Sequence, residues 1–364
     1  MAVLQEYKCP CCGGAIAFDT DLQKLKCPYC DTEFELEALK GYDEVLKSTD
    51  KEDNIEWESD ANEWRDGETD GMRIYVCKSC GGEIVGDESL AATSCPFCDN
   101  PVVLMGQFRG DLKPDYVIPF KLDKNRAKAE FAKHLQGKKL LPKAFQTEAR
   151  IDSIKGVYVP YWLFDSDVDA SIRYRATRVT SWSDSSYHYT KTSFYSVLRE
   201  GSISFEKVPV DGSDKIDNSL SESVEPYNYA DITDFQTAYL AGFIADRYNV
   251  ESDDCRPRAN QRIKKSTETS FARTVTGYAS VTTEQSSVVT KRGSMKYALL
   301  PMWLMSTQWN GGTYLFAMNG QTGKFVGNLP CDKSEKNKRF FLSFLIGTAI
   351  SFGVLMLLRL IGIL

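Results

Sequence analysis

One cysteine pattern occurs twice in this chain, and it limits how both stretches can fold. Cys9 to Cys30 and Cys77 to Cys98 follow the same spacing, Cys-x2-Cys-x14-Cys-x2-Cys. With a constant offset of 68 and no gap, residues 7–31 (the first module) and residues 75–99 (the second module) are identical at twelve of 25 positions. The module has therefore been duplicated. The repeated cysteines are Cys9, Cys12, Cys27, Cys30, Cys77, Cys80, Cys95 and Cys98.

Two Cys-x2-Cys turns supply the four thiolates that a tetrahedral zinc ion requires. In both modules the first pair is followed by two glycines, which can adopt the positive φ that turns backbone N–H groups toward the sulfurs. The second pair encloses a proline and an aromatic residue. We expect two structural zinc ions, each in a closed shell that leaves no position for a catalytic water.

The alternatives to zinc are disulfides or a redox dithiol. Disulfides need an oxidising compartment, and no signal peptide precedes the first cysteine. A redox dithiol needs one Cys-x-x-Cys pair, not four cysteines twice over. We expect Cys11 to point outward rather than to replace a ligand, and Cys255 and Cys331 to be ordinary reduced thiols.

The C-terminal end predicts a membrane-spanning helix. Residues 340–358 are nineteen residues without a charge, which as a helix span about 28 Å, close to the hydrocarbon thickness of a bilayer. The alternative is a buried core helix. Small residues four apart, Gly347/Ser351 and Ala349/Gly353, would allow two such helices to pack as a homo-oligomer, although small residues are common in membrane helices generally. Four basic residues precede the span and one follows it, which places the N-terminal part in the cytoplasm: Lys333, Lys336, Lys338, Arg339 and, after the span, Arg359.

These signals define an α+β protein with two N-terminal zinc ribbons, a strand-rich central domain of mixed α and β structure, and one C-terminal transmembrane helix. The expected domains are zinc ribbon 1 at 1–38, an acidic linker at 39–72, zinc ribbon 2 at 73–104, a mixed α+β cytoplasmic domain at 105–332, a basic flank at 333–339 and the transmembrane helix at 340–358.

The charge distribution argues against nucleic acid as a partner. Residues 31–74 contain sixteen acidic and five basic side chains, which would repel phosphate backbones. Ribbons that bind DNA or RNA usually carry basic and aromatic residues on their exposed strands. Trp57 and Trp64, at helical spacing within the acidic stretch, are expected to pack onto a ribbon or the body of the protein.

The central region predicts strands and three helices. Residues 157–164 form an apolar run of strand length, followed by alternating apolar residues from Val168 to Ala176. A segment that begins at Lys155 resembles one that begins at Lys296, which suggests two related strands. Apolar periodicity favours helices at 124–136, 231–248 and 257–274, and the Asn319-Gly320 step predicts a hairpin turn.

Two charged features of this region have ordinary interpretations as well as functional ones. The triplet Asp165, Asp167 and Asp169 suggests calcium, but the glycine and distal carboxylate of an EF-hand loop are missing, so a solvated strand face is expected. The basic helix at 257–274 could contact anionic lipid headgroups or could be a solvated face.

No catalytic machinery is evident. The chain has two histidines, His134 and His188, and contains no Gly-x-Ser-x-Gly motif. The segment from Gly320 to Lys324 lacks the glycine spacing and the Ser or Thr of a phosphate-binding loop, so an ATP-driven helicase is excluded. We do not expect an enzyme.

Several motifs together resemble the bacterial membrane-anchored proteins known as TFIIB-type zinc ribbon-containing proteins. They are the paired ribbons and the segments 115–121, 156–162 and 316–327. Members of that group are encoded beside phage-shock-type and flotillin-like membrane-stress proteins, and some carry a primosomal helicase label. The resemblance implies a zinc-ribbon adaptor that recruits protein partners to the membrane in envelope stress or membrane organisation. The alternative is a nucleic-acid-associated zinc-ribbon protein.

Overall fold

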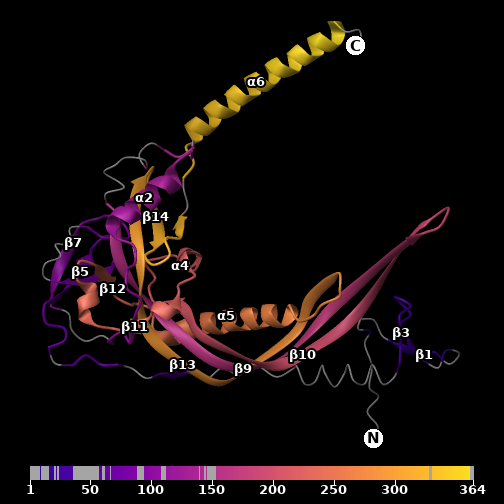
Figure 1. Ribbon diagram of the computed structural model, residues 1–364, viewed down its shortest axis with the longest axis horizontal. Coiled ribbons are helices and arrows are strands. Elements are labelled where there is room, and N and C mark those ends of the chain that lie inside the picture. The colour runs from indigo at the N-terminus through magenta and orange to yellow at the C-terminus, as the bar shows by residue number, and fades with distance from the viewer. Residues whose placement is uncertain are drawn as a thin grey trace. The chain divides into compact units, whose positions relative to one another are not determined.

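The computed structural model describes residues 9, 16–19, 22, 24–35, 57–59, 62–65, 67–87, 94–107, 112–138, 140–142, 145, 153–327 and 330–360. They form a strand-rich, mixed α and β structure with two N-terminal cysteine clusters and a long apolar C-terminal helix, which confirms the predicted fold class (Figure 1). The chain divides into two compact units, each assembled from separate stretches. Unit 1 comprises Met1–Asp60, Leu163–Val210 and Ser252–Lys296, and unit 2 comprises Ala61–Trp162, Asp211–Glu251 and Tyr297–Leu364.

The second module lies within the main sheet. The order of strands along that sheet is β11-β8-β13-β9-β12-β6-β5-β7, and β14 connects β13 to β15. In β12, Ile244 lies opposite Val157 of β9 in a parallel pair, and Asp246 lies opposite Ile84 of β6 in an antiparallel pair. The bounds are β5 (Met72–Cys77), β6 (Glu83–Asp87), β7 (Val102–Gln107), β8 (Tyr116–Val117), β9 (Lys155–Ser183), β11 (Thr233–Asp234), β12 (Ile244–Asp246), β13 (Ser280–Trp309), β14 (Gly312–Asn319) and β15 (Phe325–Gly327).

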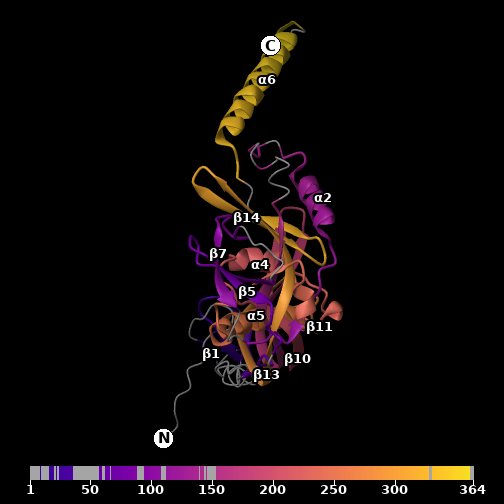
Figure 2. The same ribbon diagram turned by 90° about the vertical axis from the view of Figure 1, so that its left-hand side faces the viewer.

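The helix α2 (Lys124–Leu135) covers a core in unit 2. Asp123 caps it by accepting a hydrogen bond from the Arg126 backbone N–H at 2.8 Å. Its apolar stripe of Ala127, Phe131 and Leu135 is buried in a cluster that includes residues of β13 and β14, as the sequence pattern predicts. Figure 2 shows α2 beside the strands near β14.

Aromatic side chains from distant segments meet in the same unit. The rings of Phe120 and Phe243 stack with centroids 4.1 Å apart. Gly156 of β9 must be glycine here, because a Cβ would lie 2.6 Å from the Phe243 ring. The cluster therefore packs β9 against one loop that precedes it in the sequence, at Phe120, and one that follows it, at Phe243.

Unit 1 contains long strands covered by one helix. β10 (His188–Asp211) pairs with β9, and β4 (Glu58–Ser59) pairs with β13 in parallel. Figure 1 shows α5 (Ser252–Ala272) along these strands. The Tyr174 hydroxyl of β9 donates to the Glu268 carbonyl of α5 at 2.8 Å. The alternating residues of β9 are buried as predicted: Val168, Ala170, Ile172, Tyr174 and Ala176.

The remaining sequence predictions have mixed outcomes. The predicted hairpin turn lies between β14 and β15, and the basic helix is α5, which begins at Ser252, five residues before the predicted start. The predicted helix at 231–248 is wrong, since that segment forms η2 (Tyr229–Asp231), β11, η3 (Thr237–Leu240) and β12. Trp57 and Trp64 pack on aromatic rings, as expected, with centroids 4.8 Å from Phe164 and 5.9 Å from Phe235.

The C-terminal helix α6 (Lys333–Leu360) has the length and composition of a membrane span. Its segment Lys333–Leu357 is long and apolar enough to cross a bilayer, and the most apolar stretch of this segment contains no buried residue. A core helix of a water-soluble domain would bury such a surface. Figure 2 shows α6 as one continuous helix.

Candidate metal centres

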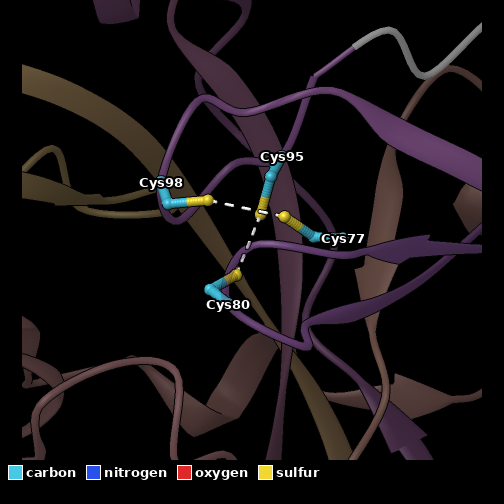
Figure 3. Close-up of side chains that lie close together, drawn as sticks. All are labelled: Cys77, Cys80, Cys95 and Cys98. Carbon is cyan, nitrogen blue, oxygen red and sulfur yellow. Dashed lines mark hydrogen bonds between the residues drawn. The ribbon is translucent and has the colours of Figure 1, made fainter.

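The second module brings four cysteine sulfurs together (Figure 3). Cys77 ends β5, Cys80 lies in the turn to β6, and Cys95 and Cys98 lie in the turn before β7. The sulfurs of Cys77 and Cys98 are 3.5 Å apart, those of Cys80 and Cys95 are 3.6 Å apart, and all four lie within 4.8 Å of one another. Disulfide sulfurs would be separated by about 2.05 Å, so these are free thiols.

The separations fit a thiolate-bound metal ion. Metal–sulfur bonds of about 2.3 Å in tetrahedral geometry place neighbouring sulfurs about 3.8 Å apart. The backbone of the two turns fixes this geometry. The backbone N–H of Cys77 donates to the Gly82 carbonyl at 2.9 Å, and the backbone N–H of Gly81 donates to the Cys77 carbonyl at 2.8 Å. Gly81 has a φ of 71°, which favours glycine.

Local contacts shift the pKa values of three of these thiols in different directions before a metal binds. Burial raises the pKa of Cys80 to about 11 and raises the pKa of Cys95 as well. Burial also acts to raise the pKa of Cys98, but hydrogen bonds from Asn100, with smaller contributions from Cys77 and Cys80, lower it to about 7. The Asn100 side chain donates to the Cys98 sulfur at 3.3 Å. Cys98 is therefore the first of the three to supply a thiolate.

Residues from β9 and β13 hold the second turn of this cluster. The ammonium group of Lys155 donates to the backbone carbonyls of Ser94 at 2.8 Å and Cys95 at 3.3 Å. It also lies 3.8 Å from the Asp99 carboxylate. The Gln308 side chain donates to the Cys98 carbonyl at 3.2 Å. The sequence did not predict that Lys155 or Gln308 would contact the cluster. Lys155 was noted only as the start of a segment that resembles the one beginning at Lys296.

The first module repeats the same turn in a separate sheet of three strands, β1 (Ala17–Asp19), β2 (Lys24–Lys26) and β3 (Glu33–Phe34). The sulfurs of Cys9, Cys27 and Cys30 lie within 4.8 Å of one another, and those of Cys9 and Cys30 are 3.6 Å apart. The expected fourth ligand, Cys12, lies outside the described residues, as does Cys11. In the part of the chain that the structure describes, these two clusters are the groups that could hold a metal ion.

The aspartate triplet of β9 makes hydrogen bonds across to β10. The Lys207 backbone N–H donates to Asp165, Ser204 donates to Asp167 at 2.6 Å and Ser202 donates to Asp169. Lys291 also forms an ion pair with Asp169 at 2.8 Å. These contacts agree with a polar strand face.

Two cysteine clusters that could each hold a metal ion, a strand-rich body and a C-terminal apolar helix define a protein with zinc-ribbon-like cysteine sites and one candidate membrane segment. The chain belongs to the family of a Bacillus subtilis (strain 168) protein named "Uncharacterized protein YdjG". The two are 33% identical over 329 residues, which cover 90% of this chain and 91% of that protein. No family model and no solved structure matches the chain.

Proposed function

We propose that this protein is an adaptor anchored in the cell membrane, with two structural zinc ions and a cytoplasmic part that recruits protein partners. The observation that carries the proposal is a closed four-cysteine cluster within the body of a chain that ends in an unburied apolar helix. A tetrathiolate site stabilises a fold and supplies no open position for substrate. A single anchor helix holds the rest of the chain at a bilayer surface.

The cytoplasmic side is favoured by two independent features. Basic residues gather before the apolar stretch, where Lys333, Lys336 and Lys338 begin α6 and only Arg359 follows. Free thiols that bind zinc also require a reducing compartment. The setting of envelope stress or membrane organisation follows from the resemblance to TFIIB-type zinc ribbon-containing proteins, and phage-shock-type or flotillin-like proteins are the partners that it implies.

The test combines fractionation with metal analysis of the same preparation. We expect the full chain to remain in the membrane fraction after washes with high salt and carbonate, and a chain that ends at Arg339 to become soluble. Two zinc ions should accompany each chain. A full chain found in the soluble fraction would overturn the anchor, and fewer than two zinc ions per chain would overturn the metal assignment.

A further inference from the structure

The outer side of α2 is basic. On its inner side the helix buries one apolar stripe in the core of unit 2, formed by Ala127, Phe131 and Leu135. Arg126 and Lys133 are seven residues apart, so they lie on one side of the helix, and both are exposed. The Lys133 side chain retains 74% of its accessible surface, and its ion pair with Glu130, at 3.7 Å, is also exposed and therefore weak.

Basic residues gather in two stretches of this acidic chain. Residues 124–143 contain seven basic residues and one acidic residue, and residues 333–339 contain four basic residues and one acidic residue. The net charge of the whole chain is −6. Positive charge concentrated in this way on a chain of opposite net charge is typical of a surface that meets an anionic partner.

The fold of unit 2 brings these two stretches together. The backbone N–H of Asp332 donates to the carbonyl of Leu140, in the turn that follows α2, at 2.8 Å. The Asp332 carboxylate caps α6, because it accepts a hydrogen bond from the Ser334 backbone N–H at 2.9 Å. Figures 1 and 2 both show α2 near the end of unit 2 from which α6 leaves. A segment distant in sequence therefore lies at the start of the anchor helix.

This contact lies within reach of the lipid headgroups. The stretch without charges begins at Phe340, and the helix rises about 10 Å from Lys333 to that residue. The headgroup layer takes up about 5 to 8 Å of that distance. Leu140 is 37% exposed, and Lys138 is close to it in the same turn. Lysine side chains extend their ammonium groups into such a polar layer.

We propose that the outer side of α2, with Arg126 and Lys133, docks unit 2 on the anionic lipid headgroups of the membrane that holds α6. The guanidinium and ammonium groups bind lipid phosphates, and the attachment of the neighbouring turn to the start of α6 favours lipid over nucleic acid as the source of those phosphates. This inference rests on the membrane anchor of the proposed function and adds a second contact with the same bilayer. A single helix leaves the body free to rotate, and the second contact fixes its orientation.

The test places a fluorescent amino acid at Ala129, an exposed position between Arg126 and Lys133, in the full chain reconstituted into vesicles. The vesicles contain phosphatidylcholine and a lipid with a nitroxide on its headgroup, which quenches at short range. We expect quenching to rise at least about threefold when about one third of the lipid is phosphatidylglycerol. Because salt screens charges, about 1 M salt should reverse the increase. Quenching that is the same with and without phosphatidylglycerol would overturn the inference.

Two charge variants with the same probe assign the effect to α2. Arg126→Glu combined with Lys133→Glu should abolish the added quenching. The helix should remain folded, checked by circular dichroism, because the first change gains and the second loses a favourable interaction with the helix dipole. The matched control, Lys265→Glu combined with Arg273→Glu, makes the same change in charge at exposed positions of unit 1 and should retain the quenching. Equal losses in the two variants would overturn the inference.

Two further outcomes separate this inference from its alternatives. A full chain that does not float with the vesicles overturns the anchor and the α2 contact together, whereas a chain that floats without added quenching overturns the α2 contact alone. If an RNA oligonucleotide changes the fluorescence at Ala129 and anionic vesicles do not, the basic side binds nucleic acid and the inference fails.

Discussion

Asp246 is a buried carboxyl group in β12, between β6 and β9. Burial raises its pKa well above the usual range, and the nearby Asp211 carboxylate raises it further, while the proximity of Ser213 acts in the opposite direction. The folded state therefore keeps this proton to a higher pH than the unfolded state does. Because the unfolded pKa is about 3.9, this group reduces stability progressively as the pH rises above that value.

We predict that Asp246→Asn removes the loss of stability that the Asp246 carboxyl causes as the pH rises. The difference in Tm, variant minus wild type, should rise by about 2 to 4 °C between pH 5 and pH 8, measured by thermal unfolding of the full chain in detergent. Protonation of zinc ligands affects both chains equally, so the difference isolates Asp246. Asp214→Asn is the control, because a hydrogen bond from Lys215 lowers the pKa of that exposed carboxyl and its replacement should lower Tm above pH 5. A Tm difference for Asp246→Asn that does not change with pH would contradict the argument.

At the scale of the element, α5 stabilises unit 1 through one stripe of side chains. Cys255, Ala259, Ile263 and Thr267 are buried, and Ile263 is fully inaccessible. Ile263→Ala should reduce the free energy of unfolding by about 2 to 5 kcal/mol, since it removes apolar contacts and leaves a cavity. Lys265→Ala, on the exposed face of the same helix, should change it by less than about 0.5 kcal/mol. Chemical denaturation followed by circular dichroism measures both, and equal effects would show that α5 does not pack as described.

Elements with strong local signals were predictable from the sequence. The stripe of Ala127, Phe131 and Leu135 predicts α2, and the alternation from Val168 to Ala176 predicts the buried face of β9. The similarity of the segments at Lys155 and Lys296 also corresponds to two neighbouring strands, β9 and β13.

The segment 231–248 was not predictable, because its aromatic spacing fits a helix although its partners are distant in sequence. Phe235 packs on Trp64 and Phe243 stacks on Phe120, from separate short turns. Gly242, with a φ of 79°, interrupts any continuous helix. Pairing of β12 with β6 and β9 then determines the conformation of Ile244–Asp246. Tertiary contacts outweighed the local pattern.

At the scale of the whole molecule, the cysteine spacing predicts which cysteines come together but not which residues surround them. Spacing alone predicts four ligands in each module, and the structure brings together Cys77, Cys80, Cys95 and Cys98 of the second and Cys9, Cys27 and Cys30 of the first. Lys155 and Gln308, which hold the second cluster, are distant from it in sequence and belong to strands with no cysteine signal. Each unit is also assembled from three separate stretches of chain. Composition along the sequence does not predict which distant stretches pack together. Two modules that look equivalent in sequence therefore occupy different environments.

This difference predicts that the two ions leave at different rates. In the second module Lys155 and Gln308 bind the turn that carries Cys95 and Cys98, and such second-shell contacts typically change metal affinity by about 10- to 100-fold. In the first module Cys30 is exposed. With excess chelator, the full chain should release zinc in a fast phase and in a slow phase, each of about one ion, measured with a colorimetric zinc indicator.

Two variants assign the phases. Cys30→Ser should abolish the fast phase alone, because it removes a ligand of the first cluster. Lys155→Met keeps the length of the side chain but removes the ammonium group, so it should accelerate the slow phase by about tenfold and leave the fast phase unchanged. A single phase in the wild type, or an effect of Lys155→Met on the fast phase, would mean that the contacts of Lys155 do not distinguish the two sites.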